Sequence, residues 1–322
     1  MKAAVYYQTG APDVLRYEDV ADPGCHPKGV VIDVKAIAIE GGDVLNRAGG
    51  AMTSTPHIVG YNCSGVIREA GADVTDRKVG DRVMTFMASG SHAERVAVPA
   101  TQTWLVPDGC SIEHAACVPV SWGTAHDCLF EFGHLKAGET VLIQAGTSGV
   151  GIAAVQLAKR AGARVLATSS SDEKLERLKQ YGMDVGINYR DGSFVDAVRK
   201  ATDNRGCDLV VDSVGGATLQ GSIDCLAYRG RAITVGNVSR GDMKIDPSNL
   251  GAGNRSLTGV FLGAEALMNP GRVTPILNDL LRDIAKGELK VVVDRSFPLS
   301  EAAAAHAYIE SRAAFGRVIM VP

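Results

Sequence analysis

The chain has 322 residues, of which 46% are hydrophobic and 21% charged; these values predict a folded protein of two domains and exclude disorder as its main state. It carries 33 Lys and Arg against 36 Asp and Glu, a net charge of −3, without a block of like charges, so we expect neither nucleic acid nor an anionic membrane surface as its main partner. No apolar stretch approaches the roughly 18 residues that span a bilayer, which excludes an integral membrane protein.

The chain begins with an expected strand, Lys2 to Tyr7, and further short apolar runs follow to about Val120. Gly, Pro and Asp separate these runs, a pattern typical of an irregular β domain. They lie at 30–39, 65–67, 81–86 and 94–98. The start of the chain lacks the long apolar run of a signal peptide, and the seven cysteines are scattered without a C-x-x-C pair. We therefore expect a reduced, cytoplasmic protein with neither a disulfide framework nor a four-cysteine zinc loop.

From about Gly138 the pattern changes to apolar strands that alternate with helical segments, which predicts an α/β domain with a doubly wound parallel sheet. Six strands are expected, at 140–145, 164–168, 185–188, 208–212, 231–235 and 256–261. Helices are expected at 150–160 and 172–180, the second with Ser171 as its N-cap. A tail with helices at 275–286 and 301–311 and strands at 291–294 and 317–321 returns to the first domain. The predicted domains are 1–120 with 263–322, and 121–262.

A glycine-rich loop follows the first strand of this domain. It reads Gly146-Thr147-Ser148-Gly149-Val150-Gly151 and leads into the apolar helix. Small residues let the backbone approach a diphosphate, and the helix N-terminus turns N–H groups toward its charge. Ser148 stands where the G-x-G-x-x-G pattern has its second glycine. The βαβ context nevertheless predicts dinucleotide binding rather than a merely tight turn.

The end of the second strand decides between cofactors, because NAD-binding proteins carry an acidic residue there for the ribose 2′-hydroxyl. This chain has Ser169 and Ser170, then Ser171 and Lys174. Hydroxyls and an ammonium group suit a 2′-phosphate, which favours NADP(H). In the alternative interpretation the serines form a polar loop and helix cap, and Asp172 binds the ribose.

In these segments the chain resembles the medium-chain dehydrogenase/reductase superfamily and, within it, the zinc-independent quinone oxidoreductase (zeta-crystallin-like) branch. The resemblance covers essentially the whole chain. Besides the glycine-rich loop, it rests on Met1-Lys2-Ala3 with 10–15, on 60–67, on 79–83, on Gly123-Thr124-Ala125 and on Glu310-Ser311-Arg312. It implies a GroES-like β domain joined to a Rossmann domain, with the active site in the cleft between them.

Two absences place the chain in that branch. Zinc-dependent relatives have a His after the glycine of the segment that reads Gly60-Tyr61-Asn62 here, and a Cys ligand earlier in the chain. Neither is present, nor are the four closely spaced cysteines of a structural zinc site. We expect no bound metal, which disfavours a zinc-dependent alcohol dehydrogenase.

The resemblance also implies cofactor contacts by matching positions. Lys174, Tyr189 and Arg312 match the contacts of the 2′-phosphate. The nicotinamide end is expected to meet Thr124, Gly236 and Asn237, with backbone groups of Val260 and Phe261 near its carboxamide. For Tyr189 the alternative is an ordinary aromatic side chain at a strand end, and for Arg312 a solvated helix end.

The expected substrate side departs from the family pattern N-x-x-D-x-x-x-R. Glu40 stands at the Asn position, Asp43 and Arg47 match, and Leu45 replaces a frequent Tyr. Near a dry nicotinamide, Glu40 could have a raised pKa and act as a proton donor. The alternative is a turn residue paired with Arg47 or with solvent.

Four more residues complete the candidate catalytic set, namely Asp43, Tyr61, Asn62 and His92. His92 takes a position where relatives commonly have Tyr, and it could hydrogen-bond a substrate carbonyl or serve a purely structural role. For Tyr61, Asn62 and the nearby Trp122, core packing is the alternative.

The simplest reaction for such a site is hydride delivery from NADPH to a quinone. A reductase of the C=C bond of an enone or enoyl thioester is the close alternative. A hypothesis of another class is a sensor that binds NADPH without turnover. The resemblance also implies a homodimer that pairs edge strands.

Overall fold

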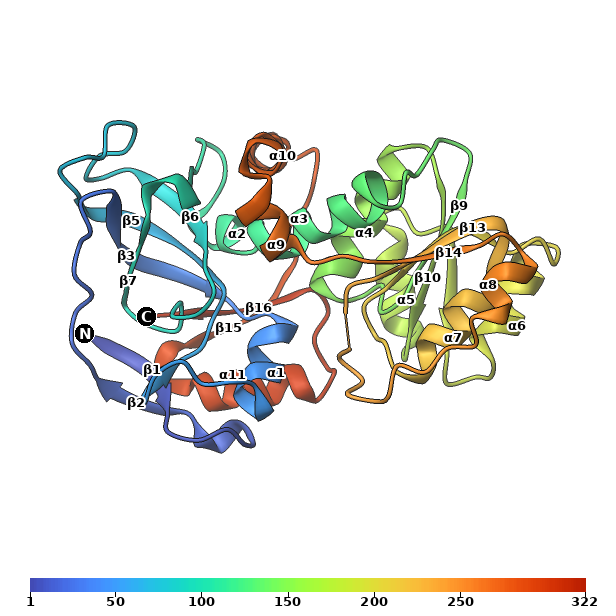
Figure 1. Cartoon of the computed structure of the whole chain (residues 1–322), viewed down its shortest axis with the longest axis horizontal. Helices are drawn as coiled ribbons and strands as arrows, with labels where there is room; N and C mark the ends of the chain where they lie inside the picture. The colour runs from blue at the N-terminus through green and yellow to red at the C-terminus, as the bar shows by residue number, and fades with distance from the viewer. The chain divides into compact units, whose positions relative to one another are not determined.

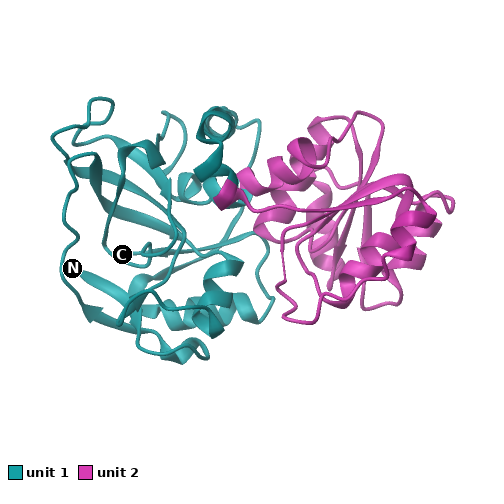
Figure 2. Ribbon diagram, viewed as in Figure 1, with its two compact units in different colours: residues 1–121, 265–322 teal, residues 122–264 magenta.

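In the computed structural model, which describes residues 1–322, the chain forms two units (Figure 2). Unit 1 comprises residues 1–121 and 265–322, and unit 2 comprises residues 122–264. Helices α3 (Pro119–His126) and α9 (Leu262–Met268) carry the chain across the two boundaries. Unit 1 is therefore completed only when the C-terminal segment returns to it.

Unit 1 is built on two sheets (Figure 1). The larger has the strand order β15-β16-β3-β5-β6-β8, with β7 paired to β3. Its strands are β3 (Gly29–Ala38), β5 (Asn62–Ala70), β6 (Arg82–Phe86), β7 (Arg95–Pro99), β8 (Thr103–Leu105), β15 (Val293–Pro298) and β16 (Arg317–Val321). The smaller, of order β2-β1-β4, contains β1 (Lys2–Tyr6), β2 (Arg16–Asp19) and β4 (His57–Ile58). Antiparallel pairing of β16 with β3 joins the two ends of the chain in one sheet.

The core of unit 1 mixes residues from both segments of the chain. Val30, Ile32 and Ile67 pack in one buried cluster with Phe297 and Met320. The helices of this unit are α1 (Gly41–Gly49), α2 (Ile112–Ala116), α10 (Pro270–Ala285) and α11 (Ala302–Glu310), with 3-10 turns η1 (Pro12–Val14), η2 (Ala100–Gln102) and η4 (Leu299–Glu301). The GroES-like part of the predicted fold is confirmed.

Unit 2 contains the predicted doubly wound parallel sheet, which is confirmed with six strands in the order β11-β10-β9-β12-β13-β14. These are β9 (Thr140–Ile143), β10 (Arg164–Ser169), β11 (Val185–Asn188), β12 (Cys207–Asp212), β13 (Leu226–Thr234) and β14 (Ser256–Gly259). The central strand β9 is buried throughout, as expected when helices cover both faces of a parallel sheet. The helices are α4 (Gly149–Arg160), α5 (Asp172–Lys179), α6 (Phe194–Ala201), α7 (Ala217–Asp224) and α8 (Ser248–Ala252), and the π-helix η3 (Asp127–Glu131) follows α3.

The largest differences from the predicted elements are in β13, which begins at Leu226 rather than at 231, and in the C-terminal segment. Helix α10 begins at Pro270, five residues before the predicted start at 275, because a proline suits the first turn of a helix and Pro275 is accommodated inside it. Strand β15 lies at Val293–Pro298 rather than 291–294. The predicted strand at 317–321 and the N-cap Ser171 are confirmed, and the Ser171 hydroxyl accepts a hydrogen bond from Lys174 N.

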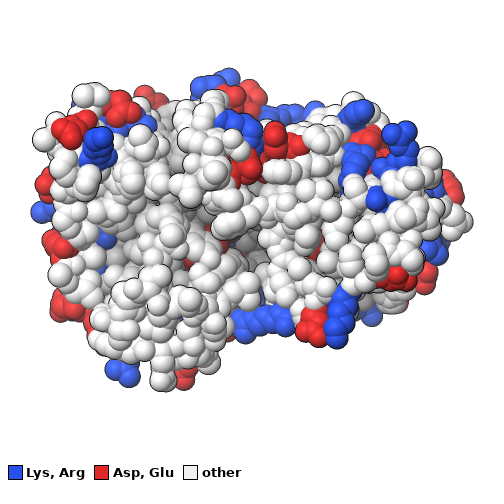
Figure 3. Space-filling view, in the orientation of Figure 1, with Lys and Arg blue, Asp and Glu red and all other residues white.

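No helix is both long and apolar enough to cross a lipid bilayer. On the face shown in Figure 3, Lys and Arg side chains lie among Asp and Glu mainly around the rim, and the middle of the face is largely uncharged. That face carries no broad basic patch, which agrees with the small net charge of −3.

Candidate functional site

The glycine-rich loop connects β9 to α4, and its glycines are fixed by close packing. A Cβ on Gly146 would lie 2.6 Å from Cβ of Ala167, and a Cβ on Gly151 would lie 2.4 Å from the carbonyl oxygen of Ala145. Real Cβ atoms do not approach other atoms this closely, so any side chain at either position would push the loop away from its neighbours. The first turn of α4 therefore lies directly against the end of β9.

Helix α4 begins with a side-chain cap inside this loop. Ser148 is its N-cap, and the Ser148 hydroxyl accepts a hydrogen bond of 3.0 Å from Gly151 N. The serine at the second glycine position therefore replaces a glycine by a capping group. A twelve-residue helix has a positive N-terminal end, and a cradle of small residues at that end fits a diphosphate.

The predicted 2′-phosphate residues of unit 2 lie at the carboxyl ends of β10 and β11. The Ser169 hydroxyl is buried 3.4 Å from the Thr147 hydroxyl, which ties the end of β10 to the glycine-rich loop. Tyr189 N donates to Ser169 O at 3.1 Å, and Lys174 lies in the first turn of α5. The structure thus brings Ser169, Lys174 and Tyr189 to one edge of the sheet, with Ser170 next in the chain.

The alternative ribose residue, Asp172, has another partner. Asp172 Oδ1 accepts a hydrogen bond of 3.1 Å from the Asn188 side chain at the end of β11. This contact directs the carboxylate along the start of α5. A hydroxyl-rich strand end with an ammonium group beside it fits a 2′-phosphate. Arg312 belongs to unit 1, and its contact with the cofactor stays a prediction.

The residues predicted for the nicotinamide end are divided among three segments of unit 2. Thr124 is buried in α3, whereas Gly236 and Asn237 follow β13. Val260 is buried and its N–H donates to Thr234 O, while the neighbouring Phe261 is 74% exposed. The Val260 N–H is therefore already engaged within the sheet. The roles of all five residues stay predictions.

On the substrate side, the structure corrects the interpretation of Glu40. Glu40 lies between β3 and α1 with only 4% of its surface exposed, and both of its carboxylate oxygens pair with the guanidinium of Arg317. Burial raises the pKa of Glu40, and the charge and hydrogen bonds of Arg317 oppose that rise. Burial acts to lower the pKa of Arg317, but the charges of Glu40 and Cys117 and the hydrogen bonds to both together raise that pKa. Glu40 is thus paired with Arg317 rather than with Arg47 or solvent, and its role as a proton donor stays a prediction.

Asp43 lies beside Glu40 in the core, and its predicted catalytic role stays a prediction. It has no exposed surface, and its Oδ2 accepts a hydrogen bond of 2.8 Å from Glu40 N at the start of α1. Burial raises the pKa of Asp43 well above its usual range, although that hydrogen bond opposes the rise. Asp43 thus caps the first turn of α1 from inside the core and has no surface from which to meet a substrate.

Asn62 and His92 are likewise fully buried. Asn62 donates to Ala116 O, and His92 Nε2 lies 3.0 Å from Nε2 of His306. Burial, with a contribution from His306, lowers the pKa of His92 well below its usual range. The His92 ring thus contacts a partner 214 residues away in the sequence, and its predicted hydrogen bond to a substrate carbonyl stays a prediction.

Among the five candidate catalytic residues, Tyr61 alone keeps exposed surface. Its hydroxyl accepts a hydrogen bond of 2.8 Å from the Asn46 side chain on α1. A Cβ on Gly42 would lie 2.3 Å from the Tyr61 ring, so the glycine makes room for the phenol over the start of the helix. Burial raises the pKa of Tyr61, which keeps the phenol protonated at neutral pH.

Three partners of the candidate residues, Arg317, His306 and Asn46, were not predicted from the sequence. Arg317 and His306 come from the C-terminal segment, and no local pattern links them to Glu40 or His92. Asn46 could have been found, since it lies on the exposed side of the helix that carries Asp43. Trp122 is almost fully buried, in agreement with the packing alternative.

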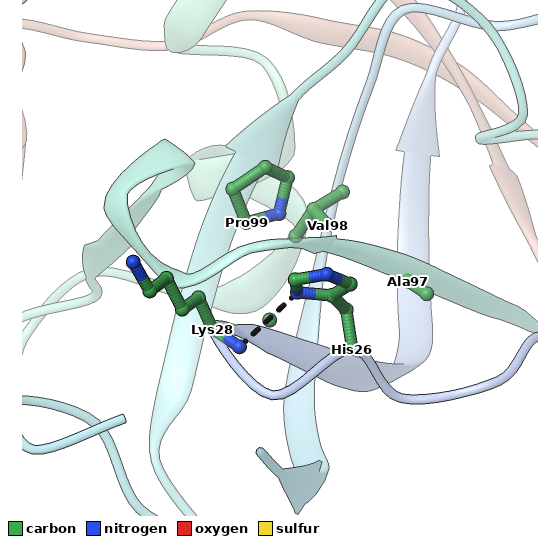
Figure 4. A pocket seen from close by; sticks show the side chains of 6 residues that line it. His26, Lys28, Ala97, Val98 and Pro99 are labelled. Carbon is green, nitrogen blue, oxygen red and sulfur yellow. Dashed lines mark hydrogen bonds between the residues drawn. The ribbon is translucent and has the colours of Figure 1, made fainter. Parts of the chain in front are cut away.

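A cavity of about 280 Å³ lies elsewhere in unit 1, between the start of β3 and the end of β7 (Figure 4). It is lined by His26, Lys28, Gly29, Ala97, Val98 and Pro99. His26 Nδ1 accepts a hydrogen bond from Lys28 N within it. None of the predicted site residues lines this cavity. No group of three or more His, Cys, Asp or Glu side chains is arranged to hold a metal ion.

Comparison with known proteins agrees with both halves of this description. Residues 26–108 match the alcohol dehydrogenase GroES-like domain, and residues 149–282 match the zinc-binding dehydrogenase family. The chain is 32% identical to 2-haloacrylate reductase of Burkholderia sp., over 99% of this chain and 98% of that protein. It is also 32% identical to quinone oxidoreductase of Pseudomonas aeruginosa, over 97% of each chain. The crystal structure of Escherichia coli quinone oxidoreductase complexed with NADPH superposes with a TM-score of 0.95, at 28% identity over 100% of each chain.

Proposed function

Because the chain belongs to the quinone oxidoreductase branch of the medium-chain dehydrogenase/reductase superfamily, we propose that it is an NADPH-dependent, zinc-independent oxidoreductase that reduces a quinone. The observation that carries the proposal is the cradle at the N-terminus of α4, together with the serine and lysine cluster at the ends of β10 and β11. These residues fit a dinucleotide that carries a 2′-phosphate.

In this proposal each part of unit 2 has a distinct task. The glycine-rich loop holds the diphosphate, and Ser169, Ser170 and Lys174 hold the 2′-phosphate. Bound NADPH would supply a hydride, and with one proton a quinone becomes a hydroquinone while NADPH becomes NADP⁺. The protein orients the two reactants and stabilises the oxyanion that develops on the acceptor.

Reduction of a C=C bond conjugated to a carbonyl is the second candidate, and the similarity to 2-haloacrylate reductase favours it. Hydride addition to such a bond leaves an enolate that needs a proton. The half-buried Tyr61 phenol, fixed by Asn46, is the group that could donate it in unit 1. A hydroquinone oxyanion, in contrast, takes its proton readily from water.

The primary experiment measures NADPH consumption, with NADH as the control, against benzoquinone, phenanthrenequinone, cyclohexenone, crotonyl-CoA and 2-chloroacrylate. Product analysis separates enzymatic turnover from spontaneous quinone reduction. Turnover restricted to quinones supports the proposal, and a saturated product from an enone, thioester or haloacrylate replaces it with the second candidate. NADPH binding without turnover on any acceptor favours a sensor.

Substitution of Tyr61 separates the two candidates further. Tyr61→Phe keeps the ring over Gly42 and removes only the hydroxyl, and general acid catalysis contributes about 10² to 10⁴ in rate. We expect kcat for a C=C substrate to fall by at least about 10²-fold, while quinone reduction changes little. Asn46→Asp, which removes the amide donor to the phenol, should reproduce part of the loss. An equal loss on both substrate classes would contradict this assignment.

The cofactor preference has its own test. Lys174→Ala should weaken NADPH binding by about tenfold and leave NADH binding unchanged, because only NADPH carries the 2′-phosphate. Lys179→Ala, at the other end of α5, is the control, since Lys179 pairs with Glu176. An unchanged NADPH preference in Lys174→Ala would remove Lys174 from the site.

We further propose a homodimer and a reducing, cytoplasmic location. Strand β14 is an edge strand of its sheet, with partly exposed residues that can pair with a second copy. All seven cysteines are free thiols, and six of them are buried. Light scattering of the purified protein measures the mass directly, and a monomer at micromolar concentration would refute the dimer.

A further inference from the structure

The residue before the glycine-rich loop has an unusual backbone conformation. Ala145 has φ of +50°, in the left-handed region that residues with a side chain rarely adopt. Its carbonyl oxygen accepts a hydrogen bond of 2.9 Å from Ser148 N and faces the first turn of α4. The conformation of Ala145 therefore sets the direction in which the loop leaves β9. A strained residue at this position needs surrounding contacts that hold it.

Thr168 on β10 supplies those contacts. Its hydroxyl oxygen accepts a hydrogen bond of 3.1 Å from Ala145 N, and its carbonyl oxygen accepts one of 2.9 Å from Gly146 N. Thr168 therefore accepts hydrogen bonds from both peptide N–H groups next to the strained residue, those of Ala145 and Gly146. Thr168 is 2% exposed, so water does not compete for these hydrogen bonds.

The hydroxyl of Thr168 is the end of a buried chain of hydrogen bonds. Thr168 donates to Gln144 Oε1 at 2.7 Å, and Gln144 Nε2 donates to the Ser222 hydroxyl at 3.1 Å. Ser222 in turn donates to Asp212 Oδ2 at 2.7 Å. The other oxygen of Asp212 accepts from Val214 N and Gly215 N, at 2.8 and 2.9 Å.

Which group donates and which accepts in each of these hydrogen bonds follows from the last residue of the series, Asp212. An ionised carboxylate only accepts, so Ser222 must donate to Asp212 and accept from the amide nitrogen of Gln144. That choice leaves the amide oxygen of Gln144 to face Thr168. The Thr168 hydroxyl must then donate to Gln144, and its lone pair is left for Ala145 N. The Asp212 carboxylate at the end of β12 thus determines that the Thr168 hydroxyl accepts a hydrogen bond from Ala145 N.

We propose that Thr168, Gln144, Ser222 and Asp212 form a positioning chain that holds Ala145 in its left-handed conformation and so preorganises the glycine-rich loop for the diphosphate. The chain also joins this loop to the segment after β12, where a Cβ on Gly215 would lie 2.9 Å from Asn237 Oδ1. None of the four residues is among the predicted contacts of the cofactor. The inference rests on the proposed NADPH binding, and it concerns the conformation of the glycine-rich loop before NADPH binds.

The decisive test combines two substitutions. Thr168→Val removes the hydroxyl at nearly constant volume, and Ala145→Gly removes the Cβ that makes the left-handed conformation unfavourable. We expect Thr168→Val to raise the Kd for NADPH by about tenfold, as fits the loss of a buried hydrogen bond. Adding Ala145→Gly should restore Kd to within about threefold of the wild-type value, because glycine needs no support in this conformation. Thr168→Ser keeps the hydroxyl and should bind like the wild type.

Thr202→Val is the matched control. Thr202 is a buried threonine of unit 2 whose hydroxyl also donates to a carbonyl oxygen, that of Val198, and accepts from an N–H, that of Gly206. It lies at the end of α6 and has no contact with the loop. We expect Thr202→Val to lower the melting temperature about as much as Thr168→Val and to leave Kd for NADPH unchanged.

A second measurement does not depend on the cofactor. Amide hydrogen exchange of residues 144–151 in the cofactor-free protein should be faster in Thr168→Val than in wild type or Thr202→Val. Equal effects of the two valine variants on Kd and exchange, or failure of Ala145→Gly to restore binding, would overturn the positioning role. If the wild-type protein does not bind NADPH, the proposed function fails; faster exchange in Thr168→Val alone would still support the role in ordering the loop.

Discussion

The two units of the molecule treat their buried polar side chains differently. Beneath the glycine-rich loop of unit 2 lies the positioning chain of Thr168, Gln144, Ser222 and Asp212. Each of its buried polar groups has a hydrogen-bond partner. In unit 1, buried polar groups keep atoms that lack a hydrogen-bond partner within the protein, among them Tyr6 Oη, Asp43 Oδ1, Arg47 Nε, Asn62 Oδ1, His306 Nδ1 and Arg317 Nε. The network beneath the loop thus leaves none of its four side chains without a partner, whereas the buried charged groups of unit 1 are paired through only some of their polar atoms.

The difference lies in how far apart the partners are in the chain. The hydrogen bonds under the loop join side chains that are 24 residues apart, for Thr168 and Gln144, and 78 residues apart, for Gln144 and Ser222. In unit 1, Glu40 meets Arg317 and Arg47 meets Glu310 across 277 and 263 residues. The C-terminal segment therefore supplies the counter-charges without which the first part of unit 1 would bury Glu40 and Arg47 unpaired. Unit 2 can form its network by itself, but unit 1 needs both ends of the chain.

The largest expected effect comes from separating the Glu40 and Arg317 pair. Arg317→Met leaves the buried carboxylate of Glu40 without a counter-charge, and breaking a buried ion pair in this way lowers the free energy of unfolding by about 3–5 kcal/mol. Urea denaturation monitored by circular dichroism measures the loss. The double variant Glu40→Leu with Arg317→Met should recover most of it, because no charge then remains buried. Equal destabilisation by the single and double variants would contradict this account.

A pair in unit 2 provides the comparison. Arg231 pairs with Glu139, and each side chain keeps about a fifth of its surface exposed, 20% and 21%. Water can solvate a carboxylate in that position after its partner is removed, so Arg231→Met should lower the free energy of unfolding by only about 1 kcal/mol. A loss as large as that of Arg317→Met would show that the two units do not differ in this respect.

The same contrast explains which features the sequence could predict. Strands β11 and β16 were predictable to the residue because period and β-branched composition are local signals. The glycine-rich loop and the caps Ser171 and Ser148 are local as well. The partners of Glu40 and His92 could not be predicted because Arg317 and His306 lie in the last twenty residues or so of the chain. For a carboxylate or imidazole at such a position, the sequence alone does not identify a hydrogen-bond or ion-pair partner that lies far away along the chain. The fold is needed to show that partner.

The buried imidazole pair predicts a smaller effect, which depends on pH. Burial, and then the nearby charge of Arg47, lowers the pKa of His306 to about 3. The unfolded chain takes up this proton near pH 6.5 while the folded protein does not, so stability is retained above pH 6.5 and falls below it. The expected decline is about 1.4 kcal/mol per pH unit for this group.

The measurement compares wild type with His306→Gln in urea at pH 7.5, 6.5, 5.5 and 4.5. Buried carboxyls with raised pKa, such as Asp43, change stability in the opposite direction, so only the difference between the two proteins isolates the histidine. The wild type should lose stability relative to His306→Gln as pH falls below 6.5. A difference that stays constant with pH would mean that His306 has the same pKa in the folded and unfolded protein.

The smallest expected effect belongs to the helix caps of unit 2, and it distinguishes stability from function. Ser148 caps α4 in the glycine-rich loop, and Ser193 caps α6 in the same way, with its hydroxyl accepting from Asp196 N. Replacing either serine by alanine should lower the free energy of unfolding by about 1 kcal/mol. Only Ser148→Ala should also weaken NADPH binding in a fluorescence titration, because its cap orients the turn that is proposed to meet the diphosphate. If both variants bind NADPH like the wild type, the loop does not need this cap, and the order of the cradle must come from the packing of Gly146 and Gly151 against their neighbours.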